Sequence, residues 1–424
     1  MKMFEYKNIG IKIYKHVCKN GLEVYLAPNK NIKSFYVTLN VKYGSDITKF
    51  KIGDKLFKVP NGSAHFLEHK MFEQEDGITP FDFYSNLGLD CNASTNNIRT
   101  DYVFSGSNHF EEGLNFLLDY VATPYFTNEN VEKEKGIIKQ EILMYEDEPS
   151  QKLYDISFFN AYFKNQIRYQ IGGKVTDIIE ITKEDLYNIY EAFYQPQNMF
   201  LVITGNVDLK NTIKLIENNQ SKKKFSNKKV EIIREDEPLK IRKNYEEVEG
   251  NVFISKFAIN IKFNNVKLKE KVPDYLKYIS FFLDSVLGST SKLKEELIKK
   301  NLITYGFATD IVSANDYTSI LITGETDNYK EVINYIMKAL KEYSFKLKDF
   351  KTNSKLLKSY YVYMSDNIYS INSFIASQLI NRGKINENIY LDVDKMNRKE
   401  YNYVMSQIDL NNYGVVIIKP KLKK

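Results

Sequence analysis

Hydrophobic positions alternate with polar ones near the start of the chain and later recur at helical spacing. Apolar residues at every second position of "IKIYKHV" and "SFYVTLNVKYGS" predict strands, and Lys19-Asn20-Gly21 predicts a hairpin turn. In "FEEGLNFLLDYV" the apolar residues recur every three or four positions, which is typical of an amphipathic helix. In the first half we expect strands at 11–17, 22–28, 34–45 and 198–207, two extended segments within 89–107, and helices at 63–72, 81–88, 110–126, 128–149, 152–163 and 183–194.

The second half repeats this order at an offset of about 218 residues. Segment 253–263 corresponds to the strand at 34–45, and segment 301–326 corresponds to 86–107. An offset this long indicates a duplicated domain, because the repeats of a solenoid are far shorter.

The alternating strands and helices predict an α+β fold built from two tandem homologous domains, each with a mixed sheet flanked by helices. A chain of 424 residues is also too long for a single ordinary core. Residues 210–245 are rich in Lys, Asn and Glu and weakly apolar, which is typical of a connecting segment. We therefore expect an N-terminal domain at 1–215, a linker at 216–245 and a C-terminal domain at 246–424.

Charge and cysteine content narrow the function classes. The net charge of +6 is spread along the chain, and the lysine runs at 221–229 and at the C-terminus are interpreted as solvated, so we expect no nucleic-acid partner. Cys18 and Cys91 are the only cysteines, which excludes a disulfide framework and favours a reducing compartment. No signal-peptide pattern and no apolar stretch long enough to span a membrane is visible, so we expect a cytoplasmic protein.

The stretch "NGSAHFLEHKMFE" at 61–73 contains the candidate metal-binding and catalytic residues. His65 and His69 are four residues apart, so a helix places both imidazoles on one face, where they can bind one zinc ion. Glu68 lies on the same broad face and can approach a water on the metal without being a ligand, which suits a general base. The alternative is a helix that carries two surface or capped histidines.

A catalytic zinc site normally has a third protein ligand, and the expected helix at 128–149 offers glutamates. Glu141 lies in the apolar setting "IIKQEILMY", where an unpaired carboxylate is costly and a cation would offset that cost. Glu134 lies two turns away on the same stripe. The alternative for Glu141 is an ion pair with a lysine.

The second half has no histidine. At the repeat offset, Leu283, Val286 and Leu287 fall where the first half has His65, Glu68 and His69. We therefore expect metal chemistry in the first half only.

The order His-x-x-Glu-His is the inverzincin signature. Together with "EKEKGIIKQEI" further along, it resembles the pitrilysin-type (M16) zinc metallopeptidases, in particular short bacterial members of the YmfH type and the mitochondrial processing peptidase β subunit. The resemblance is strongest over 30–210 and continues through the second half by length and element order. It implies half of a clamshell formed by two homologous domains.

The resemblance also implies a role for each residue of the motif. His65, His69 and Glu141 match the zinc ligands of the family, with one Zn²⁺ per chain. Glu68 matches the general base, and Glu134 matches a further glutamate that supports catalysis by orienting a ligand. The implied function is a zinc-dependent endopeptidase that cleaves peptides or unfolded segments inside a chamber, with the water on zinc activated by Glu68.

The stretch "CNASTNNIRTDY" resembles the strand beside which these enzymes add an extended substrate to a sheet edge. Asn92 and Ala93 are the positions expected to bind substrate. Without the resemblance, an ordinary strand with a polar face would be the better interpretation.

Many relatives grip substrate with an Arg–Tyr pair from the metal-free half, and Arg382, Tyr390 and Tyr305 are weak candidates here. Since no pair matches well, we expect a dimer, with a heterodimer containing a metal-free paralogue slightly favoured over a homodimer. The alternative function is a non-catalytic subunit of such a heterodimer. Against it, this sequence retains every metal ligand and Glu68.

Overall fold

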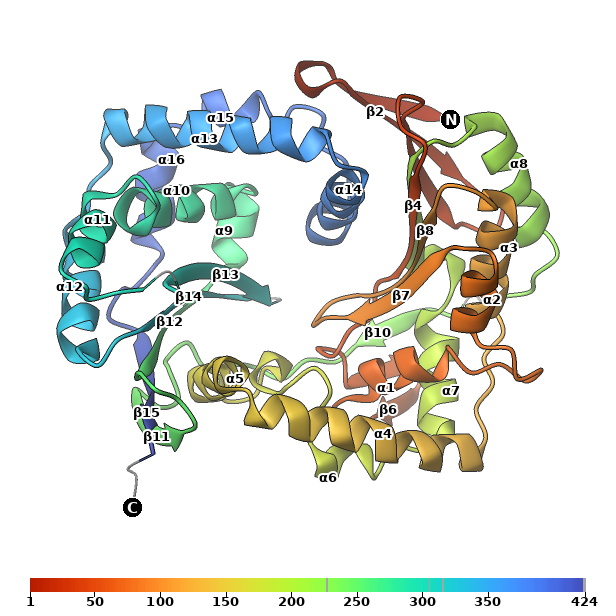
Figure 1. The fold of residues 1–424 in the computed structure, drawn as a ribbon, viewed down its shortest axis with the longest axis horizontal. Coiled ribbons are helices and arrows are strands. Elements are labelled where there is room, and N and C mark those ends of the chain that lie inside the picture. Colours follow the sequence, from red (N-terminus) through yellow and green to blue (C-terminus); the bar gives the residue numbers. More distant parts are fainter. Residues whose placement is uncertain (226–227, 305, 315, 422–424) are drawn as a thin grey trace. The chain divides into compact units, whose positions relative to one another are not determined.

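The computed structural model describes residues 1–424 except 226–227, 305, 315 and 422–424 (Figure 1). The chain forms two compact units. The first comprises 1–142, 170–234 and 359–390, and the second comprises 143–169, 235–358 and 391–424. Each unit has its own sheet and hydrophobic core.

The first unit is built on a seven-stranded sheet in which only β3 and β9 pair in parallel. In spatial order its strands are β1 (Lys2–Tyr6), β2 (Ile11–Val17), β3 (Glu23–Pro28), β9 (Met199–Gly205), β4 (Phe35–Val41), β8 (Thr100–Gly106) and β7 (Asp90–Thr95). Every residue of β9 is buried, which accounts for its apolar run from Met199 to Ile203. Strand β7 lies at the edge of this sheet.

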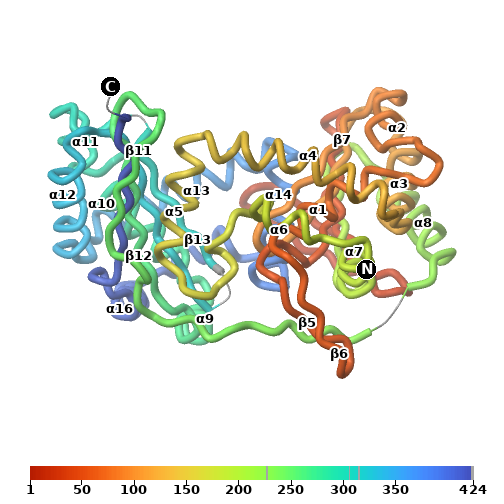
Figure 2. The backbone as a smooth tube through the Cα atoms, turned by 90° about the horizontal axis from the view of Figure 1, so that it is seen from below, coloured from red at the N-terminus to blue at the C-terminus, as the bar shows by residue number. Residues whose placement is uncertain are grey.

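Helices cover this sheet, and a small separate sheet lies beside it. The helices are α1 (Ser63–Lys70), α2 (Pro80–Asn86), α3 (Phe110–Tyr120), α4 (Asn128–Asp147), α6 (Val175–Ile178), α7 (Lys183–Phe193) and α8 (Leu209–Gln220). The small sheet pairs β5 (Lys49–Ile52) with β6 (Lys55–Lys58) and β10 (Val230–Ile232), as Figure 2 shows for the projecting β5–β6 hairpin.

The second unit has a five-stranded sheet of the same mixed kind. Its order is β11 (Tyr245–Gly250), β15 (Tyr413–Pro420), β12 (Lys256–Asn264), β14 (Tyr317–Glu325) and β13 (Ala308–Ala314). Its helices are α9 (Val266–Lys271), α10 (Tyr275–Leu287), α11 (Lys292–Lys299), α12 (Tyr329–Glu342), α15 (Asp392–Lys395) and α16 (Arg398–Ser406), and α13 (Leu347–Ser365) crosses the unit boundary. Short 3₁₀ turns occur at Lys7–Ile9, Gln166–Arg168 and Pro196–Asn198.

The duplication predicted from the sequence is visible in the elements. Strand β12 corresponds to β4, and each carries a buried asparagine, Asn260 and Asn40. The two units also exchange one helix. Helix α14 (Ile368–Arg382) packs on β4 and β9 of the first unit, and its counterpart α5 (Pro149–Ala161) packs on β12 and β15 of the second.

In both units the central asparagine lies beside the exchanged helix. Asn40 donates to the Thr38 hydroxyl, which donates to Asn372 of α14 at 2.8 Å. Asn260 donates to Ser157 of α5 at 3.2 Å. Buried polar groups need such partners, so these contacts fix where each helix docks on its sheet.

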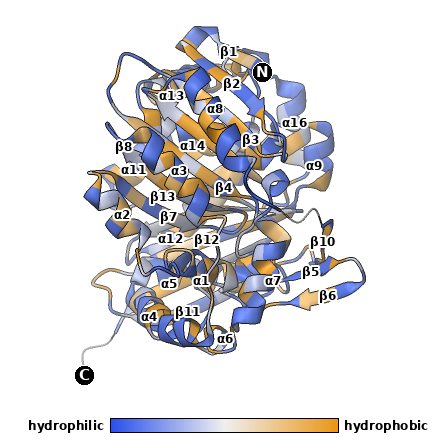
Figure 3. Cartoon of the chain, turned by 90° about the vertical axis from the view of Figure 1, so that its right-hand side faces the viewer, coloured by the Kyte–Doolittle hydropathy of each residue, from blue (hydrophilic) through white to orange (hydrophobic). Residues whose placement is uncertain are grey.

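The exchange explains why the continuous division at 1–215, 216–245 and 246–424 differs from the compact units. Sequence pattern places a helix along the chain but does not say which sheet it packs on. The predicted linker needs a correction as well, because α8 extends through 209–220 and β10 occupies 230–232. Asp208 caps α8, and Thr212 and Ile216 are buried on its inner face (Figure 3 shows both colours along this helix).

None of the helices in the described part of the chain combines the length and apolar character needed to cross a membrane.

Candidate metal centre

Helix α1 positions three of the predicted site residues. It begins after Gly62, whose φ of 86° lies in the left-handed region that favours glycine. Phe66 and Leu67 are buried in the core of the first unit and anchor the helix. His65 and His69 lie together on another face, with ring centroids 4.5 Å apart.

Helix α4 brings the third predicted ligand to these histidines. Glu141 Oε1 lies 3.6 Å from His65 Nε2, and Glu141 Oε2 lies 3.5 Å from His69 Nε2. Two ligands bound tetrahedrally to one zinc ion at its usual bond length are about 3.3 Å apart. The donor set of two imidazoles and a carboxylate, at nearly this separation, therefore fits a zinc ion with little movement.

Glu134 lies on the same helix and contacts the other nitrogen of His69. Its Oε1 is 3.0 Å from His69 Nδ1, which leaves Nε2 directed at the Glu141 side. A carboxylate in this position fixes the orientation and tautomer of a ligating imidazole. Lys70, whose side chain is fully buried, lies 3.9 Å from the other oxygen of Glu134 and is also paired with Glu73.

Glu68 is 8% exposed and accepts a hydrogen bond of 2.5 Å from Thr95 on β7. The Thr95 hydroxyl is also 3.2 Å from that of Thr100, which donates to the Tyr43 carbonyl. Burial raises the pKa of the Glu68 carboxyl, and the Thr95 hydrogen bond opposes that rise. The result is a positioned carboxyl whose pKa is shifted toward the range useful for a general base.

A glycine-lined segment packs against the start of α1. A side chain on Gly62 would meet the Gly172 carbonyl oxygen at 2.3 Å, and one on Gly173 would meet the Asn61 carbonyl oxygen at 2.6 Å. Gly172 also lies against His65, whose Nδ1 is buried and has no hydrogen-bond partner among the described residues. The close backbone approach at Gly62 and Gly173 needs residues without side chains, and it places Gly172 in contact range of the His65 ring.

The two histidines have opposite electrostatic environments. Burial, together with the neighbouring His69, lowers the pKa of His65 to about 4. Burial also acts to lower the pKa of His69, but the hydrogen bond and charge of Glu134, together with the charges of Glu68 and Glu141, outweigh it and raise that pKa above its ordinary value. The neutral His65 is ready to bind a cation, whereas His69 must lose a proton first.

Strand β7 presents the two predicted substrate-binding positions at the sheet edge. Asn92 is exposed and Ala93 is half-buried. The Asn96 N–H donates to the Arg99 carbonyl, and from there hydrogen-bonded and non-hydrogen-bonded residue pairs alternate along β7 and β8. Ala93 falls in a non-hydrogen-bonded pair, so its backbone N–H and C=O point away from β8. The Ala93 N–H donates to the Asn92 side chain at 2.8 Å. Strand β7 therefore offers an open backbone edge next to α1.

Sequence reasoning missed Thr95, Lys70 and the Gly172–Gly173 segment. The sequence could have indicated Thr95, because it shares a strand face with Ala93 in the stretch that resembles the substrate strand. No such indication existed for Lys70 and the two glycines, because their roles depend on contacts between segments far apart in the chain.

Two of the three candidates for an Arg–Tyr pair, Arg382 and Tyr390, lie among the described residues. Arg382 ends α14, and its charge acts on Tyr6 of β1, while the Tyr390 ring packs against Tyr361. Both lie in the first unit, and Tyr305 lies outside the described residues.

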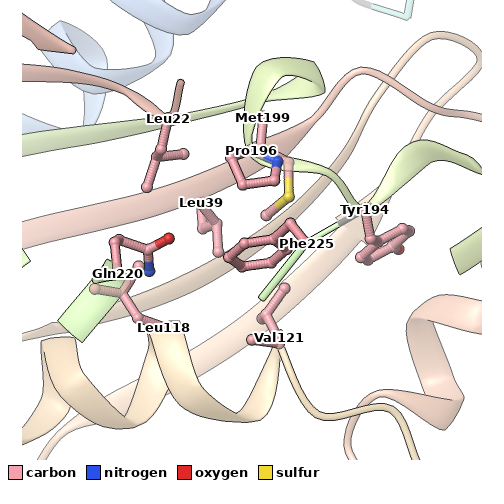
Figure 4. Close-up of a pocket in the computed structure, with 10 residues that line it drawn as sticks. Leu22, Leu39, Leu118, Val121, Tyr194, Pro196, Met199, Gln220 and Phe225 are labelled. Carbon is pink, nitrogen blue, oxygen red and sulfur yellow. The ribbon is translucent and has the colours of Figure 1, made fainter. Parts of the chain in front are cut away.

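A small cavity of the first unit is unrelated to this centre. It has a volume of about 20 Å³ and is lined mostly by apolar side chains, including Leu39, Leu118, Tyr194 and Met199 (Figure 4). None of the predicted site residues lines it, and it has room for about one water molecule.

Comparisons with known proteins match two consecutive segments of the chain to two different family models. Residues 57–173 match the family model described as "Insulinase (Peptidase family M16)", and residues 180–346 match "Peptidase M16 inactive domain". The first segment contains all of α1 and α4, with all five predicted metal-site and catalytic residues. The second contains α10, where no histidine occurs.

Individual relatives extend the similarity over more of the chain. YmfH of Bacillus subtilis, named as an uncharacterized zinc protease, is 37% identical over 332 residues, which is 77% of each chain. A probable mitochondrial-processing peptidase subunit beta of Arabidopsis thaliana is 26% identical over 44% of this chain and 35% of its own. The solved structure of an M16-like peptidase from Alicyclobacillus acidocaldarius superposes with a TM-score of 0.91, at 26% identity, over 97% of this chain and 99% of its own. The chain belongs to peptidase family M16.

Proposed function

We propose that this chain is a zinc-dependent endopeptidase that cleaves peptides or unfolded segments. The observation that carries the proposal is the convergence of His65, His69 and Glu141 beside a buried glutamate, Glu68. Relatives named as zinc proteases support the same conclusion. A non-catalytic subunit would have no need for this complete set.

His65, His69 and Glu141 would hold one zinc ion. When bound, zinc supplies a Lewis acid that lowers the pKa of water and polarises a peptide carbonyl. Glu134 holds His69 through Nδ1, so that Nε2 stays directed at the metal position.

Glu68 would take a proton from the attacking water and return it to the leaving amine. Its position is set by the hydrogen bond from Thr95, and burial brings its pKa closer to neutrality. A base with such a pKa can both accept and release the proton within one catalytic cycle.

Substrate would bind as an added strand along the open edge of β7. The Ala93 N–H would exchange its hydrogen bond to the Asn92 side chain for one to the substrate backbone. Such backbone hydrogen bonds give affinity that is largely independent of side chains. A folded protein rarely offers an unpaired strand, so extended peptides and unfolded segments are the substrate class.

The chain would act as a dimer, with a metal-free paralogue as the favoured partner. None of the candidate residues matches the Arg–Tyr pattern of the family well, and this supports a contribution from another chain. Size measurements of the purified chain, alone and mixed with such a paralogue, test this part separately.

The central test is one purification followed by two measurements. Zinc content is determined on the wild-type chain, and cleavage of an internally quenched peptide pool is followed for wild type, Glu68→Gln and the control Glu146→Gln. Glu146 is an exposed residue of α4, so its substitution should leave activity unchanged. Glu68→Gln should retain zinc and lose activity by about 100-fold or more. A zinc-loaded wild type that stays inert even with its partner would contradict the proposal.

A further inference from the structure

A second group of metal-ligating side chains lies outside the proposed catalytic centre. Among the described residues, His16, Cys18 and Glu217 bring a nitrogen, a sulfur and a carboxylate oxygen within 4.8 Å of one another. All three belong to the first unit. The chain has four histidines and two cysteines in all, so one of each meeting a carboxylate is not a consequence of abundance.

Two elements far apart in the sequence supply these donors. His16 belongs to β2 and Cys18 follows that strand, so the two side chains, separated by the exposed Val17, project to one side of an extended segment. Glu217 comes from α8, and its Oε1 lies 2.7 Å from His16 Nε2.

The backbone around Cys18 is held in place before any ligand binds. Cys18 N–H donates to the Leu22 carbonyl, and Gly21 N–H donates to the Cys18 carbonyl, both at 2.9 Å, which closes the turn of the β2–β3 hairpin. One turn along α8 from Glu217, Gln220 accepts a hydrogen bond of 2.8 Å from Asn20 in the same turn. The hydrogen bond from Asn20 to Gln220 thus ties the hairpin to α8 beside the three donors.

The three side chains differ in how far they are buried, and this difference suits a metal site. Cys18 is 3% exposed, whereas the side chains of His16 and Glu217 are 23% and 27% exposed. The thiol therefore forms the inner wall, and the imidazole and carboxylate form a side that solvent and ions can reach. Borderline-soft divalent ions such as zinc accept all three donor types.

We propose that His16, Cys18 and Glu217 form a second site for a divalent zinc-class cation, joining the β2–β3 hairpin to α8. Three protein donors leave one coordination position for water. Binding forms a bond between the cation and Cys18 Sγ, breaks the S–H bond and releases the proton to solvent. The proton between His16 Nε2 and Glu217 Oε1 moves to His16 Nδ1 or is released to solvent, and their hydrogen bond is replaced by two bonds to the same cation.

The second site should be the weaker of the two. Burial, with the charge of Glu217, raises the pKa of Cys18 to about 12, so a cation must displace a firmly held proton. At the first centre the two imidazole–carboxylate separations already match those of bound ligands, whereas the His16–Glu217 pair must open from hydrogen-bond distance. A titration should therefore fill the first centre before the second.

Cobalt(II) distinguishes the two sites because only the second has sulfur. The full chain is stripped of metal, kept reduced and titrated with Co²⁺ while near-ultraviolet absorption is recorded. Thiolate ligation gives a charge-transfer band there, and the centre of His65, His69 and Glu141 cannot produce one. Wild type should show the band, Cys18→Ser should lack it, and Cys91→Ser should keep it in full.

The remaining ligands and the independence of the two sites are tested in the same assay. His16→Gln and Glu217→Gln alter part-exposed side chains and should weaken the Co²⁺ affinity seen in the band by about 10-fold or more. Glu141→Gln should leave the band unchanged, so failure of the proposed peptidase centre does not affect this result. Absence of the band in the folded wild type, its persistence in Cys18→Ser, or unchanged affinity in both His16→Gln and Glu217→Gln would overturn the proposal.

Discussion

Helices α1 and α10 occupy repeat-related positions of the two homologous halves and differ in what they carry. Helix α1 places His65, Glu68 and His69 where α10 has Leu283, Val286 and Leu287, each at most 5% exposed. The partner helices differ in the same way. Helix α4 carries Glu134 and Glu141, whereas α13 has Thr352 and Ser359 at the corresponding positions, both exposed. One scaffold therefore supports a polar centre in one half and ordinary core packing in the other, as expected when function resides in a site placed on a fold.

The strongest test of this comparison pairs His65→Ala with Leu283→Ala, at the same repeat position. His65→Ala removes a ligand and should abolish zinc retention and peptide cleavage, with little effect on the unfolding free energy of the metal-stripped chain. Leu283→Ala removes buried apolar volume and should lower that free energy by about 2–5 kcal/mol, with zinc per folded chain unchanged. Elemental analysis and denaturant unfolding measure both. Full zinc binding by His65→Ala would show that the ligand assignment is wrong.

The second-largest expected effect is that of Glu134 on zinc affinity. Glu134→Gln loses the carboxylate that orients His69 and should weaken zinc binding by about 10- to 100-fold. Its repeat counterpart, Thr352→Val, should have no effect, because Thr352 is exposed and its hydroxyl donates to the Lys348 carbonyl one turn earlier in α13, away from any predicted site residue. Competition with a zinc-binding dye gives both affinities, and equal values for the two variants would remove Glu134 from the centre.

The sequence was sufficient to predict the parts of the centre that rest on spacing. His65 and His69 are one helical turn apart, and Glu134 and Glu141 are two turns apart, so helical geometry alone aligns each pair. The contact between the two helices required either the structure or the resemblance. Thr95, Gly172 and Gly173 act through approaches between distant segments, which no local pattern records.

The fold was predictable to a similar depth. The duplication was visible in apolar patterns, and the corresponding strands and helices are found in both units. The exchange of α5 and α14 was not visible, because each helix has the same local pattern whichever sheet it covers. Helix α8 was assigned to the linker region since Lys and Asn dominate its composition, although Ile216 and its neighbours keep helical spacing.

Loss of the hydrogen bond to Glu68 should have a smaller effect on activity than loss of Glu68 itself. Thr95→Val should lower kcat/KM by about 10-fold, the value of one hydrogen bond to a charged group. This bond lowers the pKa of Glu68 against the effect of burial, so its removal raises that pKa further. The base acts as a carboxylate, and the acidic limb of the kcat/KM profile should therefore move to higher pH. Ser313→Ala at the repeat position should leave the profile unchanged, and an unshifted limb in Thr95→Val would contradict the role of Thr95.

The smallest effect concerns the proton affinity of the two histidines in the metal-stripped chain. All histidine signals come from the first half, so NMR can follow His65 and His69 with His16 and His109 as the other resonances. The pKa of His65 should be about 4, and that of His69 should lie above 6.5. Protonation of His65 disfavours the fold, so the contribution of neutral His65 to stability is lost as pH falls from 6.5 toward 4. The contribution of protonated His69 to stability is lost as pH rises through its raised pKa.

Glu134→Gln should lower the pKa of His69 and leave that of His65 near its wild-type value, because Glu134 bonds His69 directly and is only a minor influence on His65. If the two histidines titrated together near 6.5, the metal-free centre would not hold them in these different environments. Helices α1 and α10 would then differ in amino-acid composition alone.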